Sequence, residues 1–245
     1  GALMAGFVID RVDPGAAYLV LTGGYLVSLS VLSTIRSRGQ AAPKGGQPVW
    51  QSVKEFGSEL RRNRALAIMV IVVGLVEVLG FSTQVLMPSL ARDILDVGPQ
   101  GLGIMGAFNS GGGLIVIALI SPFGELRRQG LAFLAVIHVF GLSLILLGLA
   151  TTFHLALAAI LLLACSMALS DLFSQTLMQR LVPNEFRGRA MGAWIVAIGI
   201  SPLGNLQIGA LAAVIGVGLT LVSQGAALIV LGATTVAVSA RLRKL

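Results

Sequence analysis

Long apolar runs alternate with short polar intervals along most of this chain. Each run is close to the ~20 residues that an α-helix needs to cross a bilayer. Nearly uncharged runs of this length predict membrane-spanning helices, so the expected fold class is an all-α integral membrane bundle. The predicted spans cover residues 16–35, 65–87, 101–120, 130–150, 155–178, 190–210 and 219–240.

The interval 179–194 orients these spans in the membrane. It contains Arg180, Arg187 and Arg189, and Pro183 removes a backbone donor, so the preceding helix stops before it. Each arginine costs ~2.5–3.5 kcal/mol at the centre of a bilayer, so the interval is predicted to be a water-facing loop. Its excess of arginine places this loop on the cytoplasmic side.

Counting crossings from this loop assigns every other polar interval to one side of the membrane. All but Arg11 and Arg92 of the 17 Lys and Arg residues then fall on the cytoplasmic side. Random placement would rarely produce such a bias, which supports the alternation of spans and a multi-pass protein of the plasma membrane.

The composition agrees with a membrane location. The chain is 56% hydrophobic and 11% charged, whereas soluble domains are about 25% charged. In a soluble protein, a formal charge of +7 would suggest nucleic-acid binding. Here the membrane topology accounts for the basic residues, so we expect the chain to contact lipid and no nucleic acid. His138 and His154 are the only histidines and Cys165 the only cysteine, so neither a metal nor a cofactor is predicted.

Three parts of the chain are expected to be organised differently. Residues 1–35 hold the end of one helix and a complete span, and residues 65–245 form a group of six spans. A basic linker, 36–64, joins them. Its second part, 50–60, has the apolar spacing of a weak amphipathic helix, which fits either the cytoplasmic leaflet or a solvated linker.

Three stretches resemble one family of membrane transporters. The segments 88–95 and 98–103 look like the outer loop before the eighth helix of major facilitator superfamily exporters. The segment 181–192 (LVPNEFRGRAMG) is similar to the loop between their tenth and eleventh helices, in the form typical of the siderophore-exporter and macrolide-efflux-like branch. Pro202-Leu203-Gly204 with Gly209 resembles the eleventh helix of that branch.

The resemblance implies that residues 1–9 end helix five, residues 16–35 form helix six, and the last six spans are the C-terminal half of a twelve-helix fold. The chain would then be a fragment whose partner is the N-terminal half of the same protein, in a bacterial inner membrane. Residues 124–130 are a degraded form of the family's loop motif, so the resemblance does not carry the conformational latch of that motif to this half. The loop-motif candidates are Glu125, Arg127, Arg128, Arg187, Gly188 and Arg189.

Two acids lie inside the apolar spans, Glu77 near mid-span and Asp171 about two turns from the inner end. An acid at membrane depth needs a partner or a proton, which makes either one a candidate proton carrier. The alternative is interhelical hydrogen bonding, worth ~0.6 kcal/mol per bond on average. The full set of substrate and proton-pathway candidates is Glu77, Gln84, Asn109, Asp171, Gln175 and Asn205.

Glycines are dense in the third and sixth predicted spans, where they allow helices to approach closely or, together with Pro202, to bend. The leading hypothesis is a secondary active transporter that exports a drug-like or siderophore-like small molecule by alternating access, driven by protons. The alternative is a non-transporting membrane scaffold or half-transporter subunit. An enzyme is not expected, since no catalytic constellation is evident.

Overall fold

The computed structural model describes residues 7, 9, 11, 14–34, 57–58, 60–120, 128–182 and 184–239, and every regular element in this part of the chain is helical. Most of the linker, including residues 50–56, lies outside these described residues, as do Glu125 and Arg127. In chain order the helices are α2 (Pro14–Ser33), α4 (Arg64–Leu79), η1 (Phe81–Leu86), α5 (Met87–Ser89), η2 (Leu90–Ile94), α6 (Pro99–Ile120), α7 (Gln129–Gly148), α8 (Phe153–Arg180), η4 (Asn184–Phe186), α9 (Arg187–Ile198), α10 (Ser201–Ile215) and α11 (Val217–Val238).

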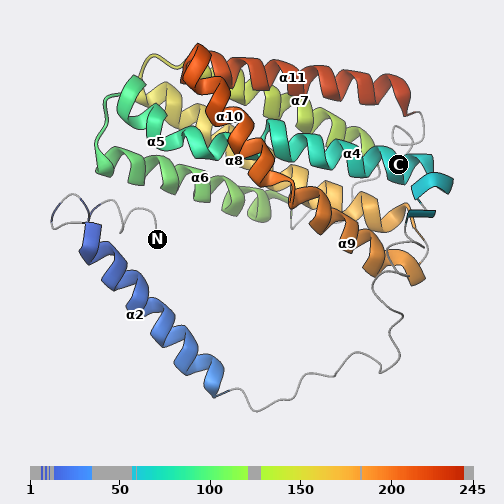
Figure 1. Cartoon of the computed structure of the whole chain (residues 1–245), viewed down its shortest axis with the longest axis horizontal. Coiled ribbons are helices and arrows are strands. Elements are labelled where there is room, and N and C mark those ends of the chain that lie inside the picture. The colour runs from blue at the N-terminus through green and yellow to red at the C-terminus, as the bar shows by residue number, and fades with distance from the viewer. Residues whose placement is uncertain are drawn as a thin grey trace.

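Six helical stretches of this part are long and apolar enough to cross a membrane, and they lie side by side in one bundle (Figure 1). Four are α6, α7, α8 and α11. The other two are composite: Arg64–Ile94 joins α4, η1, α5 and η2, and Arg187–Ile215 joins α9 and α10. The prediction of an all-α integral membrane bundle is confirmed.

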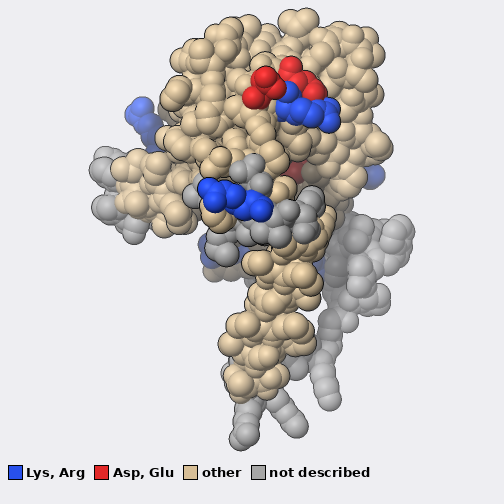
Figure 2. Space-filling view, turned by 90° about the vertical axis from the view of Figure 1, so that its left-hand side faces the viewer, with Lys and Arg blue, Asp and Glu red and all other residues tan. Residues whose placement is uncertain are grey.

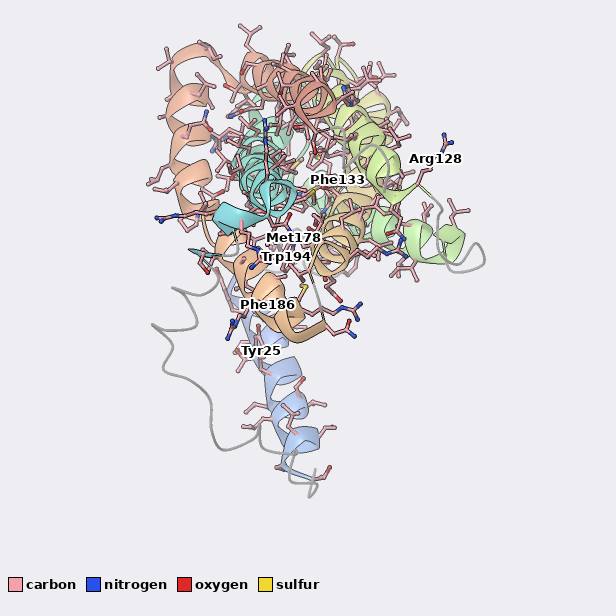
Figure 3. All side chains as sticks on the ribbon, turned by 90° about the vertical axis from the view of Figure 1, so that its right-hand side faces the viewer. Tyr25, Arg128, Phe133, Met178, Phe186 and Trp194 are labelled. Atoms are coloured by element: carbon pink, nitrogen blue, oxygen red, sulfur yellow. The ribbon has the colours of Figure 1, made fainter. Side chains whose placement is uncertain are left out.

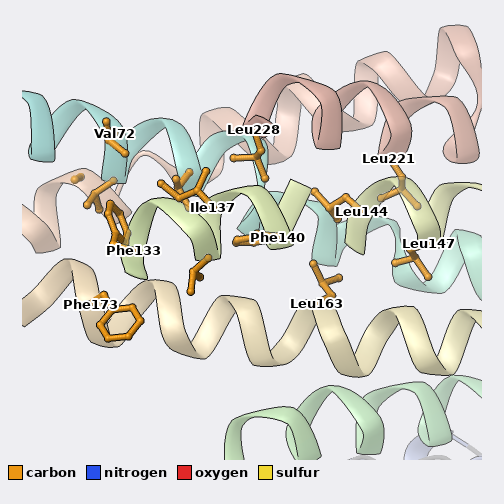
Figure 4. Packing of buried hydrophobic residues seen from close by; sticks show 14 of the residues in the cluster. Val72, Phe133, Ile137, Phe140, Leu144, Leu147, Leu163, Phe173, Leu221 and Leu228 are labelled. Carbon is orange, nitrogen blue, oxygen red and sulfur yellow. The ribbon is translucent and has the colours of Figure 1, made fainter. Parts of the chain in front are cut away.

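α7 lies at the centre of the bundle and packs most extensively against α8 and α11. Its buried side chains recur every three or four residues, which places them on one face of the helix. They meet Leu163 of α8 and Leu221 of α11 (Figure 4). Because lipid is as apolar as these side chains, close van der Waals contact is what holds the helices together. The buried α7 residues with this spacing include Phe133, Ile137, Phe140, Leu144 and Leu147.

Glycines bring α7 and α11 into backbone contact. Gly141 faces Gly225, and a Cβ atom on Gly141 would lie 2.5 Å from the Gly225 carbonyl oxygen. Gly148 faces Gly218 in the same way, also at 2.5 Å. In each helix the two glycines are seven residues apart, so they recur on one face. α7 and α11 therefore approach closely at two glycine pairs.

The expectation that glycines of the third and sixth spans allow close approach holds at some of these glycines and not at others. In α6, Gly112 does meet Ala164 of α8, but a Cβ atom at Gly111 or Gly113 would have no neighbour within 4 Å. Gly209 of α10 is equally open. In the sixth span Gly204 is tightly packed, with Ser82 and Val78 of the first composite helix beside it.

Several helix ends differ from the predicted ones. Residues 88–94, expected in an outer loop, continue the first composite helix as α5 and the single π-helical turn η2. Residues 187–189, expected in a loop, form the first turn of α9. The outer turn predicted at 212–218 is reduced to Gly216, whose φ of 81° favours glycine because it has no Cβ.

α2 lies apart from the bundle (Figure 1). Every residue from Tyr18 to Thr34 is exposed, although the helix is almost wholly apolar. A surface of this kind requires lipid or other helices around it, as the predicted helix six of a larger bundle would.

Charged groups separate to the two ends of the bundle. Figure 3 looks at the end where α4 and α9 begin and α8 ends; Arg128 and Phe186 are labelled there. Figure 2 looks at the opposite end, where a small acidic group lies beside basic side chains, and Arg92 Nε donates to Asp93 Oδ1 at 2.6 Å. The described basic residues at the first end are Arg61, Arg62, Arg64, Arg128, Arg180, Arg187 and Arg189.

Candidate functional site

The two composite helices are each interrupted near the middle of their length. α4 ends at Leu79, and after Gly80 the chain continues as the 3₁₀ turn η1. α9 ends at Ile198, and α10 starts at Ser201. Interrupted helices inside a membrane protein expose backbone groups and are typical of transporter sites.

Local sequence explains the first interruption. A Cβ atom on Gly80 would lie 2.6 Å from Cζ of Phe140, so α7 can approach only because residue 80 has no side chain. Thr83 Oγ1 donates to the Gly80 carbonyl, and Ser82 Oγ donates to the Glu77 carbonyl at 3.1 Å. These hydroxyl groups bond carbonyls that an unbroken α-helix would use itself, which favours the tighter turn.

Pro202 explains the second interruption. It has no N–H with which to continue the hydrogen-bond ladder of α9, and it is well tolerated in the first turn of a new helix. The chain bends at Gly199 and Ile200, and the Ile200 carbonyl accepts from the Leu203 amide at 2.9 Å to start α10.

The two interruptions face one another. A Cβ atom on Gly204 would collide with the Ser82 hydroxyl, and it would lie 3.0 Å from Cα of Val78. On the other side of the break, Ile200 Cδ1 lies 3.6 Å from the Cβ position of Gly74. α10 therefore crosses the end of α4 and the start of η1 with very little space between the helices.

Glu77 lies at this crossing. It is the acid of the last turns of α4, it is half-buried, and the Ser201 side chain lies near its carboxylate. Ser201 is the first residue of α10, where the partial positive charge of a helix N-terminus favours an anion. The carboxylate of Asp171 on α8, also half-buried, lies near enough for its charge to act on Glu77.

Gln84 of η1 and Asn109 of α6 form a second polar contact. The Gln84 amide Nε2 donates to Asn109 Oδ1 of α6 at 3.1 Å and approaches Met167 Sδ of α8 at 3.2 Å. Gln84 follows Glu77 by seven residues, which would place both on one face of a regular α-helix, but the 3₁₀ turn between them breaks that spacing. The structure thus joins Gln84 to Asn109 by a hydrogen bond and places Asp171 within electrostatic range of Glu77.

Asp171 is linked to α9 through Ser174. The Ser174 hydroxyl donates to the Asp171 carbonyl at 3.0 Å and accepts from Trp194 Nε1 at 3.2 Å. Trp194 of α9 packs against the hydrophobic core of the bundle (Figure 3). The remaining candidates, Gln175 of α8 and Asn205 of α10, are half-buried in their helices.

The loop-motif candidates lie at the basic end of the bundle, away from Glu77. Arg128 is exposed immediately before α7, and Arg187 and Gly188 are exposed in the first turn of α9. The Arg189 guanidinium lies 5.1 Å from the ring centroid of Phe186, which is a cation–π distance.

Sequence reasoning missed Ser201 and the role of Gly80. Both have a signal in the sequence: Ser201 directly precedes Pro202 inside an apolar run, and Gly80 follows the acid Glu77 by three residues. Among the residues that the structure describes, no group of three His, Cys, Asp or Glu side chains is placed to hold a metal ion.

These features define a class: a multi-pass helical membrane protein with interrupted helices and polar groups at membrane depth. Residues 1–204 of the 245 match the family model of the Major Facilitator Superfamily, so the chain belongs to the Major Facilitator Superfamily. A comparison with curated proteins found no match. Members of the family are secondary transporters rather than enzymes, and transport is thus the general function of this fold.

Proposed function

We propose that this chain is part of a proton-coupled exporter of small molecules in the plasma membrane. The observation that carries the proposal is the position of Glu77, a membrane-depth acid at the crossing of two interrupted helices. An ionisable side chain at membrane depth costs free energy, so acids are rare in membrane-spanning helices, and those that occur mark ion and proton pathways.

The surroundings of Glu77 support proton transfer in preference to structural hydrogen bonding alone. Ser201 of α10 and the acid Asp171 of α8 both lie near the Glu77 carboxylate, so a proton carried by Glu77 would have polar groups of two other helices beside it. Glu77 is the proposed proton carrier and Asp171 its neighbour on the same pathway.

The substrate is proposed to contact the polar groups that extend from this crossing. Gln84 and Asn109 present amide groups that bind a neutral polar function, and Met167 beside them is a soft side chain that adapts to different shapes. Gln175 and Asn205 complete the proposed pathway. The substrate class, drug-like or siderophore-like, rests on the resemblance of the loop 181–192.

Transport is proposed to occur by alternating access against an N-terminal half that packs beside this bundle. Residues 1–35 would belong to that half, residues 36–64 would be the cytoplasmic linker, and residues 65–245 would be the C-terminal bundle. The interruptions at Gly80 and at Gly199–Ile200 give each composite helix a point about which its two parts can turn.

The test is Glu77→Gln in the complete transporter, assayed for proton-driven export of a compound panel from cells. We expect export to fall to background while the amount of protein in the membrane stays unchanged. Asp93→Asn is the matched control, because Asp93 is an acid of the same bundle that pairs with Arg92 at its end. Unchanged export by Glu77→Gln removes Glu77 from the mechanism. The absence of any export by the unaltered protein favours a scaffold or half-transporter subunit.

A further inference from the structure

We infer that the amide pair of Gln84 and Asn109 recognises a substrate group that carries a hydrogen-bond donor and an acceptor side by side, as a lactam does. Gln84 binds the donor of that group, and Asn109 binds its acceptor. This inference names the substrate class of the proposed site, so it rests on the proposed function.

Met167 fixes which way the Gln84 amide points. The thioether sulfur of a methionine accepts hydrogen bonds weakly and donates none, so the Gln84 atom that faces it must be the amino nitrogen. Gln84 Nε2 lies 3.2 Å from Met167 Sδ and donates to Asn109 Oδ1 at 3.1 Å. Both hydrogen atoms of this amino group therefore have partners within the bundle, and Gln84 presents only its carbonyl oxygen, Oε1, to a ligand.

The bond between the two amides leaves one acceptor and one donor unused. Each side-chain amide has a carbonyl oxygen that accepts and an amino group that donates twice. Within the part of the chain that the structure describes, Gln84 Oε1 and Asn109 Nδ2 make no hydrogen bond, either to each other or to a third group. The pair thus lacks the second bond that would join two amides into a closed ring.

These two free atoms are open to a ligand. Among the described residues, Gln129 Oε1 is the one buried side-chain oxygen or nitrogen without a partner, so the free atoms of Gln84 and Asn109 are not sealed inside the bundle. Gly113 lies one turn after Asn109 on the same face of α6. A Cβ atom at Gly113 would have no neighbour within 4 Å, which leaves room beside the Asn109 amide.

Membrane depth makes the free atoms selective. An unpaired amide group in apolar surroundings costs free energy, and lipid tails supply neither a donor nor an acceptor. A ligand that gives Gln84 Oε1 a donor and Asn109 Nδ2 an acceptor satisfies both atoms at once. Such a site rejects an analogue that lacks the donor, because the Gln84 oxygen is then left unpaired.

A lactam meets this requirement better than a hydroxyl group does. The ring of a lactam holds its N–H donor and its C=O acceptor on neighbouring atoms and on the same side, so the two groups can bond two separate side chains. A hydroxyl group offers both functions from a single oxygen atom. Met167, whose flexible side chain adapts to different shapes, accommodates an apolar body attached to the lactam.

The experiment measures the binding of matched probes to the complete transporter in lipid nanodiscs by equilibrium dialysis, without a proton gradient and with binding to empty nanodiscs subtracted. The probes are carbostyril, phenanthridinone and isoindolinone, each compared with its N-methyl derivative, which keeps the C=O acceptor and lacks the N–H donor. Naphthol, whose one polar group is a hydroxyl, is the comparison for the lactam class. The variants are Gln84→Met and Asn109→Leu.

We expect at least one lactam to bind the unaltered protein about tenfold or more tightly than its N-methyl derivative, and more tightly than naphthol. Gln84→Met has a similar size but no carbonyl oxygen, so the ratio between the two members of the pair should fall to about one. Asn109→Leu should weaken both members alike, because both carry the C=O acceptor, and should leave the ratio near its original value.

Gln207→Met is the matched control. Gln207 Oε1 accepts from Gln224 Nε2 of α11 at 2.9 Å, so this variant loses a comparable bond between helices elsewhere and should keep the ratio. A ratio that survives in Gln84→Met is steric and overturns the inference. Naphthol binding as tight as that of the lactams, or binding of no lactam at all, also overturns it.

Export of the same probes from cells separates this inference from the proposed function. Discrimination between the members of a pair without proton-driven export contradicts the proposed function and leaves the amide pair as a binding site. Proton-driven export of other compounds without such discrimination contradicts the lactam class and leaves the proposed function in place.

Discussion

Gly141→Ala tests whether close contact between α7 and α11 holds the bundle together. The new Cβ atom would lie 2.5 Å from the Gly225 carbonyl oxygen, 2.8 Å from Ile229 Cγ1 and 3.2 Å from the Ile229 amide nitrogen. Two of these neighbours are backbone atoms, so no side-chain rotation relieves the contact. To reach even 3.0 Å, the helices must separate by about 0.5 Å, the difference between 3.0 and 2.5 Å.

The cost follows from what that separation does to the core. Leu144, Leu221 and Leu228 are fully buried along the same contact and lose dispersion contacts when the helices part. Overpacking of this kind costs about 1–3 kcal/mol, and the better helix propensity of alanine returns at most about 1 kcal/mol. We therefore expect a net loss of roughly 1–2 kcal/mol in the free energy of unfolding.

The assay is reversible unfolding of the purified protein in mixed micelles by titration with SDS. Gly209→Ala is the control, because its Cβ atom would have no neighbour within 4 Å, and it should be neutral or slightly stabilising. Gly225→Ala opens the same crossing, so the double variant should lose less than the sum of the single losses. If Gly141→Ala is as mild as Gly209→Ala, the α7–α11 contact does not determine stability.

Two further predictions follow from other contacts. The Asn63 side chain caps α4 by accepting from the Leu66 amide at 3.3 Å, and it donates to the Leu181 carbonyl at 2.9 Å. In the same SDS titration, Asn63→Ala should lower the free energy of unfolding by about 2 kcal/mol, because both hydrogen bonds are lost. Asn63→Asp keeps the cap and should lower it by about half as much. Gln84→Leu removes the side-chain hydrogen bond to Asn109, which contributes only ~0.6 kcal/mol to stability. It should raise the apparent KM for the exported compound several-fold in a vesicle assay with unchanged protein content, and an unchanged KM would place Gln84 outside the substrate pathway.

The helical fold could be read from the sequence because each span is defined by its own composition. Apolar runs such as 130–150 must be helical in lipid whatever they pack against, and α7 ends within two residues of that prediction. The loop predicted at 88–100 is shorter in the structure, because residues 88–94 and 99–100 are helical. Pro88 does not end the helix, since it lies at the start of the short helix α5, where a proline without an N–H is tolerated.

The site was predictable only in part, because it depends on which residues meet across helices. Glu77 and Asp171 stand out in any single-helix view, since acids are rare in apolar runs. Ser201 does not stand out, because a serine at membrane depth usually bonds a carbonyl of its own helix. Its significance arises only when the two helix interruptions are placed against each other, and that pairing comes from three-dimensional packing.

The most direct test of the central claim is the number of protons moved with each molecule of substrate. Reconstituted complete transporter, with a pH-sensitive dye inside the vesicles and a radiolabelled substrate, gives both fluxes from one sample. The account predicts proton movement opposite to substrate in the unaltered protein, and substrate exchange without net proton movement in Glu77→Gln. Equal proton flux per substrate molecule in both proteins would contradict it.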